Sequence, residues 1–154
     1  MATVEIGVDD PNAADVRELL RRHLEFARAN TPPEDVHALD VGQLVDPAVT
    51  FYSYRRDGEL LAVGALKQID GRHAELKSMH TAAAARRGGI GRAMVEHLIG
   101  VARDHGFSRV SLETGSTQAF APARLLYAEA GFTPCGPFGD YPTDRGNTFM
   151  TMAL

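Results

Sequence analysis

Two Asp-Gly pairs, at residues 57–58 and 70–71, separate three segments that are rich in β-branched, aromatic and other apolar residues. An Asp-Gly pair favours the tight turn of a β-hairpin, because both residues tolerate a positive φ. We therefore expect an antiparallel meander with strands over residues 49–54, 59–68 and 73–81.

Apolar residues at helical spacing predict helices on either side of this meander. Residues 16–27 show this spacing, and Thr31-Pro32-Pro33 ends the helix because proline cannot donate to it. We expect helices over residues 16–27, 33–44, 90–101 and 122–130, and further strands over residues 3–8, 109–114 and 148–153. Residues 135–146, rich in Gly, Pro and Asp, are expected to form a loop. With no linker or repeat, residues 1–154 are predicted to form a single α+β domain with a mixed central sheet flanked by helices.

Composition excludes several classes of protein. With 44% hydrophobic and 23% charged residues, the chain can bury a core, which excludes a disordered protein. No apolar run is long enough to span a membrane, and the N-terminus lacks the basic and apolar stretches of a signal peptide. Because Cys135 is the only cysteine, we expect no intrachain disulfide and no cysteine-based zinc site. No histidine pair has metal-ligand spacing, so no metal site is expected. The low cysteine content agrees with a reducing compartment, and the cytoplasm is the expected location.

Positive charge is concentrated in one part of an acidic chain. Residues 77–109 contain six basic and two acidic residues, whereas the whole chain has a formal net charge of −4. The negative total argues against a nucleic-acid partner, which requires a broad basic surface. The basic island itself has two explanations: a single anionic ligand bound there, or an ordinary solvated helix face.

A glycine-dense turn lies inside the basic island, between the strand that ends at residue 81 and the helix that begins at residue 90. Residues 88–91 contain three glycines, which lack the Cβ atoms that would keep a ligand away from the backbone. The first N–H groups of a helix have no intrahelical acceptor and carry the positive end of its dipole. Together these features predict a phosphate-binding site, to which nearby arginines add full charges.

Two common nucleotide-binding motifs do not fit this turn. The dinucleotide motif G-x-G-x-x-G would need its third glycine where Met94 stands. The phosphate loop of NTPases needs a lysine after its last glycine, and no lysine is near. The pattern that remains is Arg-x-x-Gly-x-Gly, formed by Arg86, Gly89 and Gly91.

This pattern resembles the pyrophosphate-binding motif of the GNAT superfamily, the Gcn5-related N-acetyltransferases. Residues 123–132 are similar to a second family segment, A-x-x-L-Y-x-x-x-G-F, and the expected order of elements also agrees. The resemblance is best over residues 59–135. It implies a GNAT-like fold in which two central strands splay apart and form a cleft for acetyl-CoA.

The resemblance implies transfer of an acetyl group from acetyl-CoA, as co-substrate, to an amine. The backbone amides of residues 87–93 would hold the pyrophosphate, and the strand edge at residues 79–81 would pair with the pantetheine amides. The implied cofactor contacts are Met79, His80, Thr81, Arg86, Arg87, Gly88, Gly89, Ile90, Gly91, Arg92, Ala93, Ala123 and Tyr127.

The resemblance also implies two catalytic residues, each with a structural alternative. Tyr127 aligns with a family tyrosine near the thioester sulfur, where its hydroxyl would protonate the departing thiolate. The alternative is a packed tyrosine with a solvated hydroxyl. Glu75 lies where some members place a general base, and the alternative is a solvated residue paired with Lys77. Strand alternation predicts that Glu75, Lys77 and Met79 share one face.

Other polar residues near the expected cleft receive weaker assignments. Glu113 on the next strand could be a second base, an acceptor-binding group or a structural partner, of which we favour the last. A histidine at the mouth of the cleft could assist proton transfer, but we expect surface or packing roles for most of His80, His97 and His105. Cys135 could be a nucleophile, but it has no adjacent base in the sequence, and we favour a half-buried structural thiol.

One position departs from the family pattern. Phe120 stands where the family often has an asparagine that contacts pantetheine, seven residues before the tyrosine. That contact is therefore absent or supplied by Thr117 or Gln118.

The acceptor does not follow from the sequence. The resemblance places its pocket near residues 25–44 and 136–147, whose polar and aromatic residues include Phe26, Arg28, His37, Asp40, Phe138, Asp140, Tyr141, Asp144 and Arg145. We favour a small-molecule amine acylated by direct transfer. A protein or peptide amine and a non-catalytic acyl-CoA sensor stay open as alternatives, as does a homodimer.

Overall fold

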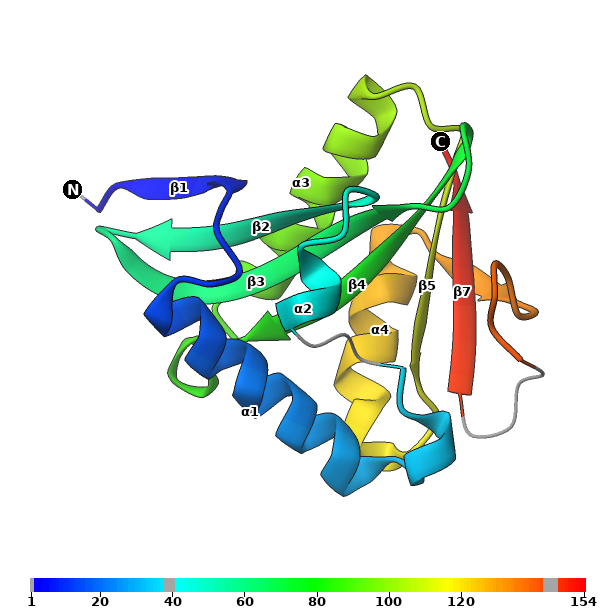
Figure 1. The fold of residues 1–154 in the computed structure, drawn as a ribbon, viewed down its shortest axis with the longest axis horizontal. Helices are drawn as coiled ribbons and strands as arrows, with labels where there is room; N and C mark the ends of the chain where they lie inside the picture. Colours follow the sequence, from blue (N-terminus) through cyan, green and yellow to red (C-terminus); the bar gives the residue numbers. More distant parts are fainter. Residues whose placement is uncertain (1, 38–40, 143–146) are drawn as a thin grey trace.

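The structure is a computed structural model that describes residues 2–37, 41–142 and 147–154. Within them, seven strands form one sheet in the order β1-β2-β3-β4-β5-β7-β6 (Figure 1). The elements are β1 (Val4–Val8), α1 (Ala14–Asn30), α2 (Val41–Leu44), β2 (Val49–Arg56), β3 (Glu59–Gln68), β4 (His73–Thr81), α3 (Ile90–Asp104), β5 (Arg109–Gly115), α4 (Ala121–Ala130), β6 (Thr133–Cys135) and β7 (Asn147–Ala153). The single-domain α+β class with a mixed sheet is thus confirmed.

The expected meander forms the centre of this sheet. Strands β2, β3 and β4 pair antiparallel in chain order. At the β2–β3 turn, Asp57 has φ 51° and Gly58 has φ 84°, the two positive values that such a hairpin turn requires. Among the strands of the described residues, only β4 and β5 pair in parallel, and α3 makes the crossover between them.

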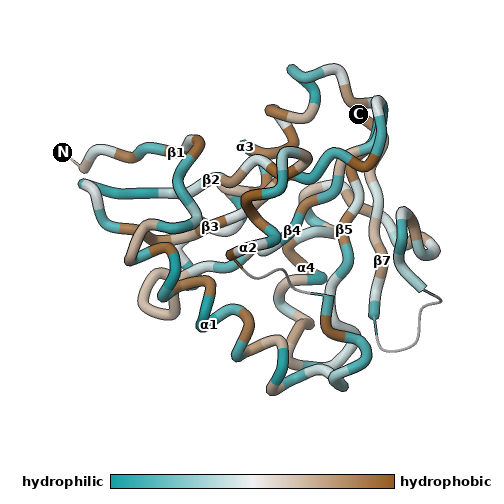
Figure 2. The backbone as a smooth tube through the Cα atoms, in the orientation of Figure 1, coloured by the Kyte–Doolittle hydropathy of each residue, from teal (hydrophilic) through white to brown (hydrophobic). Residues whose placement is uncertain are grey.

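Helices cover the sheet on both faces (Figure 1). On one face, Val16 and Leu20 of α1 pack with Phe51 and Val63. Hydrophobic and hydrophilic residues alternate along α1, as expected of a helix with one buried side (Figure 2). On the other face, α3 and α4 pack on a larger core cluster. None of the helices formed by the described residues combines the length and hydropathy needed to cross a membrane.

The two parallel strands part in the middle of the sheet. Their last paired residues are Leu76 and Leu112, yet β4 continues to Thr81 and β5 to Gly115. Figure 1 shows β4 and β5 side by side at one end and apart at the other. The expected splay is therefore confirmed, and we call the region beyond the last pair the fork.

Two expectations about secondary structure are wrong. Instead of a helix over residues 33–44, the chain forms a 3-10 turn at Pro33–Asp35 and the four-residue helix α2, with residues 38–40 outside the described part. Val36 adopts an extended conformation (ψ 117°), which ends the turn. Strand β6 lies partly in the expected loop; it tolerates Pro134 because it is an edge strand.

A β-bulge changes the faces of β4. The register places Lys77 opposite Ala65 but His80 opposite Val63, so β4 carries one extra residue, and Ser78 has φ 56°. Beyond the bulge, Met79 packs on the same core cluster as Leu76. The expectation that Met79 shares a face with Glu75 and Lys77 is therefore wrong. Gly64 makes room for the bulge, because a Cβ there would lie 2.5 Å from the sulfur of Met79.

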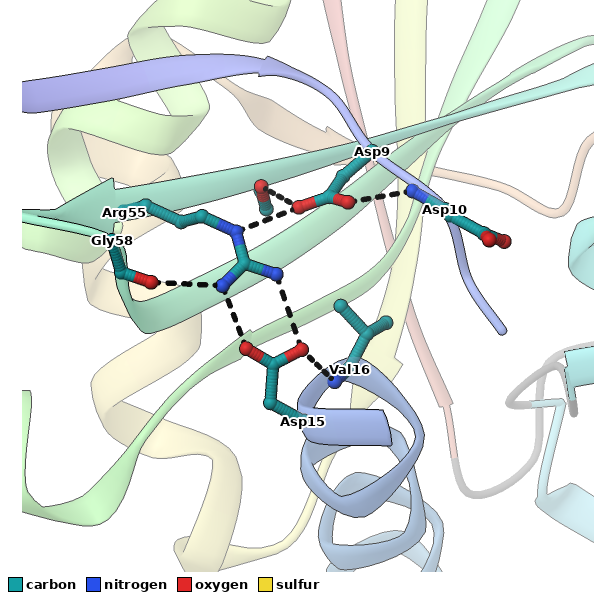
Figure 3. A network of polar contacts seen from close by, with 7 residues as sticks. Asp9, Asp10, Asp15, Val16, Arg55 and Gly58 are labelled. Atoms are coloured by element: carbon teal, nitrogen blue, oxygen red, sulfur yellow. Dashed lines mark hydrogen bonds and ion pairs between the residues drawn. The ribbon is translucent and has the colours of Figure 1, made fainter. Parts of the chain in front are cut away.

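A polar network attaches the start of α1 to the sheet (Figure 3). The Arg55 guanidinium donates to Asp9 at 2.9 Å, to Asp15 at 2.6 Å and to the Gly58 carbonyl at 3.1 Å. Asp9 also accepts the Ser53 hydroxyl, and Asp15 accepts the Val16 amide of α1. Because Arg55 and Asp9 are largely buried, these charge-assisted bonds fix the N-terminal end of α1.

Candidate active site

The turn before α3 has the geometry that an anion site requires. Arg87 and Gly89 have φ values of 69° and 78°, and Gly89 is the N-cap of the 15-residue helix. The six consecutive amides of residues 87–92 have no acceptor within the described part of the chain. The Ala93 amide donates to the Gly89 carbonyl at 3.0 Å. The series of free amides therefore ends one residue earlier than expected.

Gly91 allows α3 to start close to its neighbours. A Cβ at this position would lie 3.3 Å from Leu126 of α4 and 3.4 Å from the Thr81 hydroxyl of β4. Arg86 donates to the Thr81 carbonyl at 3.3 Å, and Arg92 donates to Glu96 at 2.8 Å. The turn is thereby held against the end of β4 with three arginines around its amides.

A cavity of about 640 Å³ occupies the fork and reaches the turn before α3. Glu75 and Glu113 line it together with most of the expected cofactor contacts, namely Met79, His80, Thr81, Arg86, Arg87, Gly89, Ile90, Gly91, Arg92, Ala123 and Tyr127. Gly88 and Ala93 do not line it. Residues from four separate parts of the chain thus surround one space.

Tyr127 lies in the wall of this cavity. Its ring packs edge-on against Phe132, with centroids 6.0 Å apart, and the side chain is buried. Among the described residues, no group forms a hydrogen bond with its hydroxyl. Burial raises the pKa of Tyr127, and the Glu113 charge adds to this, so the hydroxyl stays protonated at neutral pH. Tyr127 is therefore an uncommitted proton donor.

Glu75 is tightly held, in contrast. It is 3% exposed, and its carboxylate accepts hydrogen bonds from the Tyr141 hydroxyl and, at 3.3 Å, from the Lys77 ammonium. Lys77 also donates to the Tyr141 hydroxyl at 2.7 Å, which closes a triangle. Burial raises the pKa of Tyr141, as does the Glu75 charge. Tyr141 reaches the cluster from 66 residues away, and the sequence carries no signal for this contact.

Glu113 is the first residue of β5 beyond the last pair with β4. It accepts a hydrogen bond from the Asn147 side-chain amide at 3.1 Å. Burial raises the pKa of the Glu113 carboxyl to about 7, although the Asn147 hydrogen bond and the Lys77 charge oppose this. The hydrogen bond from Asn147 agrees with the structural role favoured from the sequence. Glu113 also lines the cavity, and this position permits a role in the chemistry as well.

Two aromatic residues, Phe26 and Phe120, are among the residues that line the cavity. Phe120, at the position of the family asparagine, packs edge-on against Phe26 of α1, with centroids 5.2 Å apart. A Cβ on Gly115 would lie 2.2 Å from the Phe120 ring, so this glycine lets the ring lie on β5.

The expected acceptor segments contribute unequally. Phe26 and His37 line the cavity, and Asn147 joins them from β7. Tyr141 and Phe138 pack on one another behind it, with ring centroids 5.3 Å apart. Arg28 and Asp140 do not line it, and Asp40, Asp144 and Arg145 lie outside the described residues.

A pair of histidines connects α1 to β4. The Nδ1 atoms of His23 and His80 lie 3.3 Å apart. Burial lowers the pKa of each to about 4, so both rings are neutral at pH 7. The packing role expected of His80 agrees with this contact, whereas His23 was not among the expected residues. No cluster of three or more metal-ligating side chains occurs in the described ranges.

Comparisons with known proteins agree with this site. The sequence model of the Acetyltransferase (GNAT) family matches residues 13–132. The chain is 42% identical to "Uncharacterized N-acetyltransferase YsnE" of Bacillus subtilis over 98% of this chain and 100% of the relative. It is 35% identical to "IAA acetyltransferase" of Azospirillum brasilense over 100% of both chains.

A solved structure shares the fold. It belongs to a Klebsiella pneumoniae protein proposed to be an acyl-CoA N-acyltransferase, and it superimposes with a TM-score of 0.83 at 24% identity over 99% of this chain and 98% of that one. From the family match and the length and identity of the relatives, the chain belongs to the acetyltransferase (GNAT) family, whose members transfer an acetyl group from acetyl-CoA to an amine.

Proposed function

We propose that this N-acetyltransferase moves the acetyl group of acetyl-CoA directly to the amine of a small molecule bound in the fork. The observation that carries the proposal is the single cavity that connects the free amides of residues 87–92 with Tyr127 and two carboxylates. Its volume of about 640 Å³ is typical of small-ligand sites. Residues of α1, residues 31–37 and Asn147 line the acceptor half, and a cavity of this volume suits a small amine better than a protein chain.

The proposed position of coenzyme A follows from two sets of free backbone groups. The amides of residues 87–92 would donate to the pyrophosphate at the positive end of the α3 dipole, with Arg86 and Arg92 beside it. The edge of β4 beyond Leu76 has lost its partner strand β5, so residues 79–81 offer N–H and C=O groups to the pantetheine amides. This path brings the thioester into the fork.

The chemistry in the fork needs a base and an acid. An amine arrives as an ammonium ion and must lose a proton to the base before its nitrogen lone pair can attack. The nitrogen then bonds to the thioester carbonyl carbon, the carbon–sulfur bond breaks, and the thiolate takes a proton from Tyr127. The attacking nitrogen loses its second proton as the amide forms, and this proton restores the Tyr127 hydroxyl, while the proton taken by the base passes to solvent. The products are the acetylated amine and free coenzyme A.

The surroundings of the two carboxylates favour Glu113 over Glu75 as the base. The carboxylate of Glu75 already accepts from Lys77 and Tyr141. Within the part of the chain that the structure describes, Glu113 has one hydrogen bond, from Asn147, and its pKa is raised to about 7, which suits a base near neutral pH. In this proposal, Glu75 holds Lys77 and Tyr141 in position; its role as the base is the competing proposal.

Replacing Tyr127 by phenylalanine should lower kcat by about 10- to 100-fold. A smaller effect than is usual for a catalytic acid is expected, because a thiolate is already a good leaving group. The dissociation constant for acetyl-CoA, measured by titration calorimetry, should change less than about threefold. Tyr52→Phe is the matched control, since Tyr52 is buried in the same core cluster but does not line the cavity. Equal rates for both variants would exclude Tyr127 as the acid.

A screen that detects the free thiol of coenzyme A tests the function as a whole. We expect turnover with small amines and little with peptides that carry a free N-terminus. Preference for peptides would overturn the small-molecule proposal. Tight binding of acetyl-CoA with no turnover across the screen would favour the sensor instead.

A further inference from the structure

One side-chain amide connects Glu113 to the wall of the acceptor half of the cavity. Asn147 is the first residue of β7, and its Nδ2 atom donates to Glu113 Oε2 at 3.1 Å and to the Asp35 carbonyl at 2.9 Å. Both hydrogens of the amide nitrogen are therefore used. Because the Asp35 carbonyl can only accept, the nitrogen side of the amide must face it, and this fixes the orientation of the group.

The register of the sheet places Asn147 beside Glu113. Asn147 lies opposite Gly115 of β5, and Glu113 lies two residues before Gly115, so Asn147 and Glu113 are diagonal neighbours on one face of the sheet. Asp35 ends the 3-10 turn that leads into residues 36–37, which line the cavity. The amide of Asn147 thus joins two strands of the sheet to a third, distant segment of the chain.

The oxygen of the same amide is uncommitted. No group in the described part of the chain donates to Asn147 Oδ1, and Asn147 lines the cavity. Among the described residues that are not exposed, Ser78 Oγ is the single buried side-chain nitrogen or oxygen atom without a partner, so Asn147 Oδ1 keeps accessible surface. A free oxygen acceptor beside a carboxylate suits an ammonium group, whose N–H groups all donate.

Several other groups act on the Glu113 carboxylate, but among the described residues Asn147 alone donates a hydrogen bond to it. Burial raises the pKa of Glu113, and the Asn147 hydrogen bond opposes this rise, as does the Lys77 charge. Lys77 itself donates elsewhere, within the buried triangle. The remaining groups that interact electrostatically with Glu113 are two carboxyls and two protonated phenols, namely Glu75 of β4, Asp35, Tyr127 of α4 and Tyr141.

We propose that the Asn147 side chain positions both partners of the first proton transfer: Nδ2 holds the Glu113 carboxylate, and Oδ1 accepts a hydrogen bond from the acceptor amine. This inference rests on the proposed function, with Glu113 as the base. An N–H bond of the ammonium breaks as the O–H bond of Glu113 forms, and Asn147 keeps both of its hydrogens. Of the three N–H hydrogens of a primary ammonium, Glu113 takes one and a second is lost as the amide forms, so the third is available to Oδ1 throughout.

The titration of Glu113 tests the contact of Nδ2 and requires no turnover. In ¹³C NMR spectra of protein labelled at the glutamate carboxyl carbons, the signal of Glu113 is the one that is missing in Glu113→Gln. The midpoint of its titration should rise by about one pH unit in Asn147→Ala, because the lost hydrogen bond favours the charged form. Asn147→Asp keeps the size of the side chain and adds a like charge, so its midpoint should rise further.

Kinetics with the best amine of the screen test the contact of Oδ1. In Asn147→Ala, KM for the amine should rise about tenfold, and KM for acetyl-CoA should change less than about twofold. The rise of kcat/KM with pH should move upward by the same amount as the NMR midpoint. Asn147→Asp retains an oxygen for the amine, so its KM for the amine should stay within about threefold of the wild type, and it replaces the alanine variant if that one does not fold.

Thr148→Ala is the matched control. Thr148 is the next residue of β7, its Oγ1 atom lies 2.8 Å from Ser116 Oγ, and it does not line the cavity. The variant therefore loses a side-chain hydrogen bond of the same strand, and any effect of that loss should appear in the melting temperature alone. The Glu113 midpoint and the KM for the amine should equal those of the wild type.

Four results would count against the inference. A lower melting temperature in Asn147→Ala, with the Glu113 midpoint and the KM for the amine unchanged, would make Asn147 a structural residue and overturn this inference alone. A raised midpoint with an unchanged KM for the amine would overturn the contact of Oδ1, and the inference with it. A raised midpoint with an unshifted pH profile of kcat/KM would exclude Glu113 as the base and overturn both that assignment and this inference. Absence of turnover with every amine would overturn the proposed function, and this inference with it.

Discussion

Glu113→Gln should lower kcat/KM by about 10²- to 10⁴-fold at pH 8 and remove its dependence on a group with a pKa near 7. Burial raises the pKa of this carboxyl to about 7, so the fraction of Glu113 that is ionised and able to accept a proton increases as the pH rises through that value. The wild-type kcat/KM should therefore rise between pH 6 and pH 8. Glutamine accepts no proton in this range. The measurement is the rate of thiol release across this pH range with the best amine of the screen.

Glu75→Gln is the control that tests the competing base. If Glu113 is the base, this variant keeps the rise near pH 7, although its activity falls because Lys77 and Tyr141 lose their shared acceptor. If Glu75 is the base, Glu75→Gln loses the pH-dependent rise and an increase in pH restores part of its activity. The two outcomes exclude one another.

The same carboxyl should also make stability depend on pH. Its pKa in the folded protein lies above the ordinary value of 4.5, so the fold disfavours the charged form. The protonated group costs no stability below about pH 4.5, and stability is lost as the pH rises toward and through 7. From the raised pKa, the loss is at most about 3 kcal/mol. Thermal unfolding at pH 5 and pH 8 should show this loss as a difference between the wild type and Glu113→Gln. The comparison of the two proteins is needed because the buried neutral rings of His23 and His80, whose pKa values are lowered to about 4, gain stability over the same pH range in both.

Features with a local cause could be predicted from the sequence. The hairpin at Asp57 and Gly58 depends on two residues that tolerate a positive φ. The turn before α3 depends on the three glycines among the four residues 88–91. The splay was expected from the resemblance and not from any residue pattern. The fork, the turn and Tyr127 nevertheless meet around one cavity.

Features that depend on distant contacts could not be predicted. The bulge at Ser78 inverts the faces of β4, and alternation across Lys77, Ser78 and Met79 gives no sign of an extra residue. The bond from Tyr141 to Glu75 joins residues 66 positions apart. The raised pKa of Glu113 results from burial of its carboxyl, and this burial depends on the folded structure and cannot be read from the sequence. The residues of the fork therefore had to be found in the structure.

Gly91→Glu should weaken acetyl-CoA binding by about 100-fold or more, an effect of about 3 kcal/mol. A Cβ at this position would lie 3.3 Å from Leu126 and 3.4 Å from the Thr81 hydroxyl, so a larger side chain must displace its neighbours or extend into the cavity. The new carboxylate would also place a negative charge at amides that are proposed to hold the pyrophosphate. Titration calorimetry with acetyl-CoA measures the loss.

Gly100→Glu provides the control for this prediction, because it makes the same change in the same helix. A Cβ at Gly100 would meet no atom within 4 Å, and the residue lies at a distance from the amides of residues 87–92 along α3. This variant should bind acetyl-CoA within about threefold of the wild type. Each variant changes one glycine of α3 and adds one negative charge to the protein, so differences in helix propensity and in total charge cancel. Equal affinity in the two variants would mean that coenzyme A does not bind at the start of α3, and the proposed path along β4 would fail with it.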